Sequence, residues 1–261
     1  MRTLLVVALL LAGCVAPAAA PALPPADAPP VLGAIGNSLM LGYNADAEHI
    51  EAAPEVAWAT GDAPWSFRAR LGAAGVENVA APGAGTDEFL DQVAQLEDAG
   101  LVLILLMDSD LCGAERPVMA PTGAFEGELR AGVKALLAKG MQPMLVTPPD
   151  ITSVAAAARA KPPANDFVLF YASGQACAQE PDVETRQAEM FATIARVAEE
   201  EGALHDHGAV ARIAWTPEMV SDMDGLHPSL VGLDAIATAV WDAYDAITRT
   251  PASASGQARG P

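Results

Sequence analysis

VLGAIGNSLM, residues 31–40, is the stretch from which the fold of this chain can be worked out. Its first five residues are apolar, which predicts a short buried strand. The strand ends at Gly36-Asn37-Ser38-Leu39, so a serine hydroxyl is expected on a turn at the carboxyl edge of a sheet. Open α/β sheets bind their ligands at that edge. Glycine, asparagine and serine also end strands for turn reasons alone.

A second polar group lies near the other end of the chain, in Asp224-Gly225-Leu226-His227-Pro228. Pro228 suits the first position of a helix, and apolar residues at helical spacing follow as far as residue 244. A serine nucleophile needs a base to take its proton and a third group to orient that base. Asp224 and His227, on one short loop, could supply both. Alternatively, His227 is a histidine at a helix start without a catalytic partner.

Four stretches together resemble the blocks of the SGNH, or GDSL, hydrolases. In that family the nucleophile follows the first strand in Gly-Asp-Ser-Leu, and an Asp-x-x-His pair precedes the last helix. The first and last blocks are matched by residues 36–39 and 224–228. Asn78-Val79-Ala80-Ala81-Pro82-Gly83 resembles the second block, and residues 103–112, LILLMDSDLC, resemble the third. The four blocks stand in family order.

This resemblance implies a serine esterase or lipase that needs no cofactor. Ser38 would be the nucleophile, His227 the base and Asp224 the acid that orients it. The oxyanion would be held by the backbone N–H groups of Ser38 and Gly83. A third donor would come from the third block, where Ser109 stands in place of the family's asparagine.

Three residues depart from the family pattern. Asn37 replaces the aspartate of the first block, Met107 the glycine of the third block, and Ser109 its asparagine. A serine hydroxyl is a shorter donor than an amide, and loss of one oxyanion donor typically lowers the rate about 10²–10³-fold. A catalytically weak or inactive protein that kept the fold as a binding module is therefore the alternative function.

Strands that alternate with helices predict βαβ units and a mostly parallel sheet. With the resemblance, this gives a three-layer α/β/α sandwich with a five-stranded, flavodoxin-like sheet over residues 31–247. Residues 39–55 show no clear pattern, and residues 151–182 are expected to form an irregular excursion over the rim of the site. Strands are expected at residues 31–35, 77–80, 101–107, 144–147 and 203–206, and helices at 66–75, 86–99, 125–139, 183–201 and 229–244.

Short motifs also resemble the phospholipase B-like branch of the family. They are Trp58-Ala59-Thr60-Gly61, Pro64-Trp65 and Pro148-Pro149-Asp150. Two tryptophans that simply belong to the core are the alternative interpretation.

The N-terminus has the pattern of an export signal. Met1-Arg2 is a short positive head, and the apolar core that follows it is too short to span a bilayer. The core ends in Leu11-Ala12-Gly13-Cys14, which resembles the bacterial lipobox. Residues 1–13 would then be removed and Cys14 lipidated. An ordinary signal peptide, cut among Ala18-Ala19-Ala20, is the alternative.

Export and lipidation would place the domain at the cell envelope, anchored to a bacterial membrane. Residues 14–30 are rich in proline and alanine and would form a semi-extended tether. Residues 248–261 are small and polar, and are expected to form a disordered tail.

Two cysteines, Cys112 and Cys177, remain after Cys14. In an oxidising compartment a disulfide between them is expected. His205-Asp206-His207 could hold a metal or be a polar cluster at a strand end, and carboxylates beside Ser109 could suggest a divalent cation. No third ligand is marked, so the sequence predicts no metal site.

The composition is strongly acidic, with 33 Asp and Glu against 14 Lys and Arg and a formal charge of −19. Such a surface repels phosphate backbones and anionic headgroups. Nucleic-acid binding is therefore not expected. The expected partners are a small-molecule or lipid ester and the membrane that holds the N-terminal lipid. The sequence does not decide the oligomeric state.

Overall fold

The structure is a computed structural model that describes residues 30–112, 122–161 and 168–249. The predicted signal segment, Cys14, the tether up to residue 29 and the tail from residue 250 lie outside the described residues.

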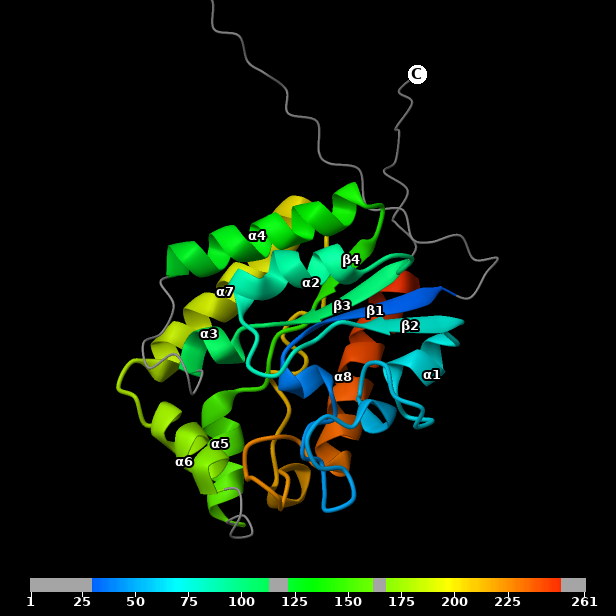
Figure 1. The fold of residues 1–261 in the computed structure, drawn as a ribbon. Coiled ribbons are helices and arrows are strands. Elements are labelled where there is room, and N and C mark those ends of the chain that lie inside the picture. Colours follow the sequence, from blue (N-terminus) through cyan, green and yellow to red (C-terminus); the bar gives the residue numbers. More distant parts are fainter. Residues whose placement is uncertain (1–29, 113–121, 162–167, 250–261) are drawn as a thin grey trace, which may run out of the picture.

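A five-stranded parallel sheet forms the middle layer (Figure 1). The chain passes from β1 to β2 on one side and then to β3 on the other side of β1, so the direction of winding reverses there. Open sheets bind ligands at such a switch point, beyond the carboxyl ends of the strands. The order is β2-β1-β3-β4-β5, with β1 Val31–Gly36, β2 Gly75–Asn78, β3 Leu101–Leu105, β4 Gln142–Leu145 and β5 Leu204–His205.

Helices cover both faces of this sheet (Figure 1). One face carries α2 (Phe89–Gln95), α4 (Thr122–Ala138) and α7 (Val183–Glu201), and the other carries α1 (Phe67–Leu71) and α8 (Leu230–Arg249). Three helices follow the carboxyl ends of β3 and β4, namely α3 Asp108–Cys112, α5 Ile151–Arg159 and α6 Val168–Cys177. Short 3-10 turns are η1 Ser38–Met40, η2 Pro54–Val56, η3 Thr86–Glu88 and η5 Pro217–Met219.

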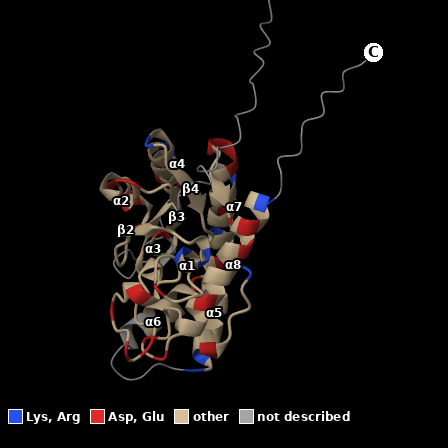
Figure 2. Cartoon of the chain, turned by 90° about the vertical axis from the view of Figure 1, so that its right-hand side faces the viewer, with Lys and Arg blue, Asp and Glu red and all other residues tan. Residues whose placement is uncertain are grey.

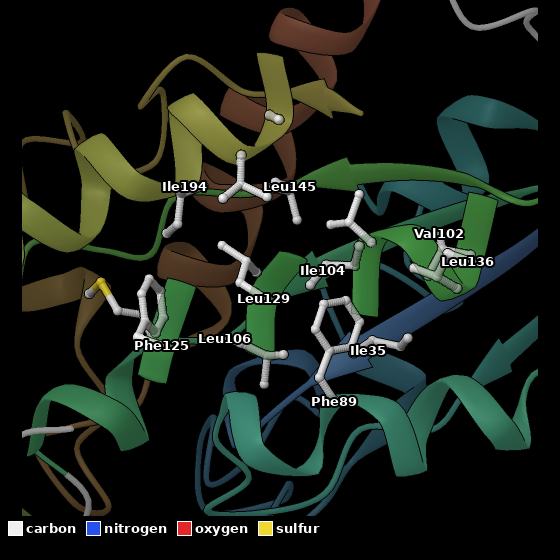
Figure 3. Close-up of a cluster of buried hydrophobic side chains, with 14 of the residues drawn as sticks. Ile35, Phe89, Val102, Ile104, Leu106, Phe125, Leu129, Leu136, Leu145 and Ile194 are labelled. Carbon is white, nitrogen blue, oxygen red and sulfur yellow. The ribbon is translucent and has the colours of Figure 1, made fainter. Parts of the chain in front are cut away.

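Two apolar clusters hold the layers together, one on each face of the sheet. Alternate strand residues such as Ile35, Val102 and Ile104 pack against α2, α4 and α7 (Figure 3). Their neighbours Ala34 and Leu103 point to the opposite face and pack with α1 and α8. This two-residue alternation, with every residue of β3 buried, is what a strand covered on both faces requires. The three-layer α/β/α fold is therefore confirmed.

Some elements differ from the sequence prediction. β2 and β4 each begin two residues earlier than expected, and β3 ends at Leu105. Residues 151–182, expected to be irregular, contain α5 and α6. The Asp150 side chain accepts from the N–H of Ser153 and caps α5, and the alanines that follow favour a helix.

The last helix is longer than the sequence predicts, and the surface of the domain is acidic. α8 spans Leu230–Arg249, whereas the sequence predicts this helix over residues 229–244. Trp58 is fully buried in the cluster under α8, and Trp65 packs against the same cluster. Figure 2 shows acidic residues spread over several helices, with few basic residues among them. Within the described ranges, no helix has both the length and the apolarity that a membrane span needs.

Candidate active site

Ser38 lies directly beyond the carboxyl end of β1, at the switch point of the sheet. The strand ends at Gly36 with φ +156°, and a Cβ there would lie 2.4 Å from the Leu105 carbonyl oxygen. Asn37 then caps η1, because its side-chain oxygen accepts from the N–H of Leu39 at 3.0 Å. The asparagine thus keeps the capping oxygen that an aspartate would offer. Ser38, the first residue of η1, is half-buried.

Gln92 on α2 fixes this strand end from outside the sheet. Its Oε1 accepts from the Gly36 N–H at 2.8 Å, and its Nε2 donates to the Gly36 carbonyl at 3.0 Å. Gln92 is buried, and its two bonds to the Gly36 backbone are of the kind that a neighbouring strand would make. The position of the turn that carries Ser38 is therefore set by a side chain 56 residues further along the chain.

Asp224 and His227 lie on the loop that leads into α8. Asp224 Oδ1 accepts from the N–H groups of Leu226 and His227, both at 2.9 Å, which closes a tight turn. The carbonyl of His227 accepts from the N–H of Ser221 at 2.9 Å, so the loop is also tied across its base. The two catalytic candidates therefore share one side of the turn, as their spacing predicts.

The structure brings this pair to Ser38. His227 Nε2 lies 2.8 Å from Ser38 Oγ, and His227 Nδ1 lies 2.6 Å from Asp224 Oδ2. Asp224 is fully buried and His227 is 4% exposed. The two ends of the chain thus meet in a Ser–His–Asp arrangement at the carboxyl edge of the sheet.

Asp224 is set up to remain ionised. Burial on its own would raise its pKa, but the His227 ring, the charge of that ring and two backbone N–H groups outweigh burial and hold the pKa below its ordinary value. A carboxylate in this state can orient the imidazole and stabilise its protonated form.

The segment after η1 adds contacts that the sequence did not indicate. Asn44 is fully buried and donates from Nδ2 to Asp224 Oδ2 at 2.8 Å. The ring centroid of Tyr43 lies 5.0 Å from that of His227. Asn44 adopts a left-handed backbone, with φ +49°. Asparagine tolerates this conformation better than most residues, which is the only hint of a special position that the sequence offers here.

Gly83, an expected oxyanion donor, lies on the exposed loop after β2. It has φ +78°, which favours glycine. The loop is joined to the nucleophile strand because the Ala81 N–H donates to the Gly36 carbonyl at 3.1 Å. The structure therefore brings this loop to the strand end that precedes Ser38.

Residues 103–112, which resemble the third block, include a turn with an unusual backbone. Met107 has φ +138°, so it occupies a glycine-like conformation at the position where the family has glycine. Ser109 is buried at the start of α3. Asp110, considered as part of a cation site, instead accepts from Thr86 N–H and Oγ1 at 3.0 and 2.9 Å. It therefore ties α3 to the turn that follows the Gly83 loop.

The cluster around His205 forms hydrogen bonds at the end of β5. Asp206 Oδ1 accepts from the N–H and the hydroxyl of Thr147, at 3.0 and 2.7 Å. His205 Nε2 lies 3.0 Å from the same hydroxyl. Over residues 30–112, 122–161 and 168–249, no group of three His, Cys, Asp or Glu is arranged to hold a metal ion.

Comparisons with known proteins identify the fold. No family model matches the chain, and no curated protein sequence matches it. TesA superposes with a TM-score of 0.53, at 16% identity, over 83% of this chain and 99% of its own. The acetylxylan esterase Axe2 from Geobacillus stearothermophilus gives a TM-score of 0.52, at 18% identity, over 82% and 93%. A protein described as an SGNH hydrolase from Slackia heliotrinireducens gives 0.51, at 19% identity, over 83% and 100%.

The protein is an α/β/α sandwich with a serine, a histidine and an aspartate at the carboxyl edge of its sheet. Among sandwiches of this kind, its fold is that of the SGNH hydrolases, as the four sequence blocks predict.

Proposed function

We propose that this protein is a serine esterase that hydrolyses carboxylic esters with Ser38, His227 and Asp224. One observation carries the proposal. Ser38 Oγ lies 2.8 Å from His227 Nε2, whose other ring nitrogen faces the Asp224 carboxylate at 2.6 Å. Nucleophile, base and orienting acid are therefore within hydrogen-bonding reach of one another, as acyl transfer requires.

In the proposed reaction, the Ser38 oxygen attacks the ester carbonyl while His227 takes the hydroxyl proton. Asp224 stabilises the imidazolium that forms. His227 then returns the proton to the leaving alcohol, and the acyl group stays on Ser38. Attack by water, again with His227 as base, releases the acid and restores the enzyme.

The oxyanion would be held by the backbone N–H groups of Ser38 and Gly83, with the Ser109 hydroxyl as a third donor. This donor is the weakest part of the site, because a serine side chain reaches less far than the family's asparagine. That difference favours one alternative, a protein with the SGNH hydrolase fold that binds a ligand without turning it over.

Hydrolysis of p-nitrophenyl acetate and butyrate tests the proposal. Wild type should hydrolyse at least one of the two esters, and Ser38→Ala should reduce the rate by about 10⁴-fold or more. Ser66→Ala is the control, since Ser66 is a buried serine that caps α1. Equal rates in wild type and Ser38→Ala would exclude the enzyme and leave the binding module.

The proposal extends to location. Cleavage before Cys14 and lipidation of that cysteine would hold the domain at the cell envelope through residues 14–30, with no transmembrane helix. In fractionated cells, Cys14→Ser should move the protein from the membrane to the soluble fraction. Membrane association that survives this substitution would contradict the lipid anchor.

A disulfide between Cys112 and Cys177 is also part of the proposal for an exported protein. Its support is that α3, which ends at Cys112, contacts α6, which ends at the buried Cys177. The side chain of Cys112 lies outside the described residues.

A further inference from the structure

Asn44 reaches the acid of the site from a distant part of the chain. Its Nδ2 donates to Asp224 Oδ2 at 2.8 Å, across 180 residues of sequence. The same Asp224 oxygen lies 2.6 Å from His227 Nδ1. The oxygen that faces the base is therefore shared between an imidazole and a neutral amide.

The orientation of the Asn44 amide is fixed by its other contacts. Its Oδ1 accepts from the Glu51 N–H at 2.8 Å, so Nδ2 must face Asp224. Its own N–H donates to the Glu51 carbonyl at 3.0 Å. Its carbonyl accepts from the hydroxyl of Ser221, on the loop that carries Asp224. Asn44 is thus preorganised as a donor and is not merely adjacent to the acid.

We infer that Asn44 is a positioning residue that sets how strongly Asp224 stabilises the charged form of His227. This inference rests on the proposed function and deepens it. A hydrogen bond from a neutral amide stabilises the carboxylate and draws part of its negative charge away from the imidazole. The Asp224 carboxylate therefore presents less negative charge to the His227 ring than it would without the Asn44 amide.

The titratable groups on the elements around the Asp224–His227 pair leave the Asn44 amide as a neutral donor to Asp224 Oδ2. The Tyr43 ring lies against His227, and its pKa is raised by burial and then by the charges of Glu51 and Asp224, so its phenol stays uncharged. Other titratable groups on the same two segments are bonded to each other: His49 Nδ1 lies 2.8 Å from Asp46 Oδ1 in the segment of Asn44, and Asp222 on the Asp224 loop pairs with Lys161.

Two substitutions separate this role from simple loop packing. Asn44→Gly keeps the left-handed backbone and removes the donor. Asn44→Asp keeps the size and places a second carboxyl group against Asp224. Both should favour the imidazolium and raise the midpoint of the His227 titration, by about 0.5–1 pH unit for Asn44→Gly and at least as much for Asn44→Asp.

The midpoint is measured by NMR titration of the histidine ring protons in the otherwise unchanged chain. The chain has four histidines, and the signal that is lost in His227→Gln identifies His227 among them. Asn78→Ala is the matched control, because the Asn78 amide donates to the Met40 carbonyl and the Thr60 hydroxyl rather than to Asp224. Its His227 midpoint should remain that of wild type.

Midpoints within about 0.2 pH unit of wild type in both Asn44 variants would overturn the inference. If Asn44→Gly does not fold, Asn44→Ala removes the same donor without adding a charge and decides alone. The titration needs no substrate, so it tests Asn44 even if no ester is hydrolysed. If esters are hydrolysed, the acid limb of the kcat/KM profile should move to higher pH by the same amount.

Discussion

The turns that follow β1 and β3 lie side by side at the carboxyl edge of the sheet, where Gly36 pairs with Leu105, but they differ in what they have kept. The β1 turn retains glycine, a capping side-chain oxygen and the serine hydroxyl, and each has a defined contact. The β3 turn has a glycine-like backbone at Met107, but its residues 107 and 109 differ from those of the family block that it resembles. The comparison teaches that the backbone path at this edge does not by itself decide which side chains a turn presents.

The largest expected loss of activity comes from disabling the acid that acts, through His227, on the serine of the β1 turn. Asp224→Asn keeps the shape of the acid but removes its charge, and it can hold His227 in the tautomer that cannot accept the Ser38 proton. We expect kcat for a p-nitrophenyl ester to fall about 10⁴-fold. Asp222→Asn, on the same loop but outside the Asp–His pair, is the control. A fall of less than tenfold would show that Asp224 does not act through His227.

Substitutions of Ser109 test whether the β3 turn contributes to the site. If its hydroxyl is the third oxyanion donor, Ser109→Ala should lower kcat about tenfold, and Ser109→Asn should raise it by up to about 10²-fold. KM should change little in either variant, because the donor acts mainly in the transition state. If kcat is unchanged in both, Ser109 does not contact the oxyanion and the two turns do not form one site.

A smaller effect is expected where α2 supports the β1 side. Gln92→Leu leaves the buried Gly36 N–H without its acceptor and should lower the free energy of unfolding by about 1–3 kcal/mol. Urea unfolding measures this, with Gln95→Leu as the control because Gln95 is exposed on the same helix. Equal stability of the two variants would mean that Gln92 does not fix the strand end.

These residues mark what the sequence could and could not reveal. Ser38, Asp224 and His227 could be predicted because each pattern is local: a strand end, and a pair three residues apart before a helix. The continuous apolar run of β3 likewise identified a strand buried on both faces. Asn44 and Gln92 could not be found in this way, since their contacts cross 180 and 56 residues and depend on the finished fold.

The two rim helices were missed for a different reason. In α5 the large apolar residues are few, and in α6 they stand consecutively at residues 168–171, so neither stretch shows the apolar spacing of a helix. The helix α5 instead follows from alanine-rich composition and the Asp150 cap, which are weaker signals than an apolar stripe.

The smallest expected effect lies further along the same edge, at His205. Burial lowers its pKa below 6.5, against the opposing charge of Asp206, so the unfolded chain binds its proton more readily. The stability that neutral His205 contributes is present above pH 6.5 and is lost as the pH falls through the lowered value. Thermal unfolding between pH 7.5 and 5 should therefore show a smaller loss for His205→Gln than for wild type. If His205→Gln loses as much stability as wild type over this range, burial of His205 is not linked to stability.

Covalent labelling of Ser38 by a fluorophosphonate tests the central claim most directly, because it reports an activated serine without requiring the right ester. Mass spectrometry of the labelled chain should find the phosphonyl group on Ser38 in wild type, and little or none in His227→Ala. An unlabelled wild-type Ser38, or equal labelling in both proteins, would contradict the account.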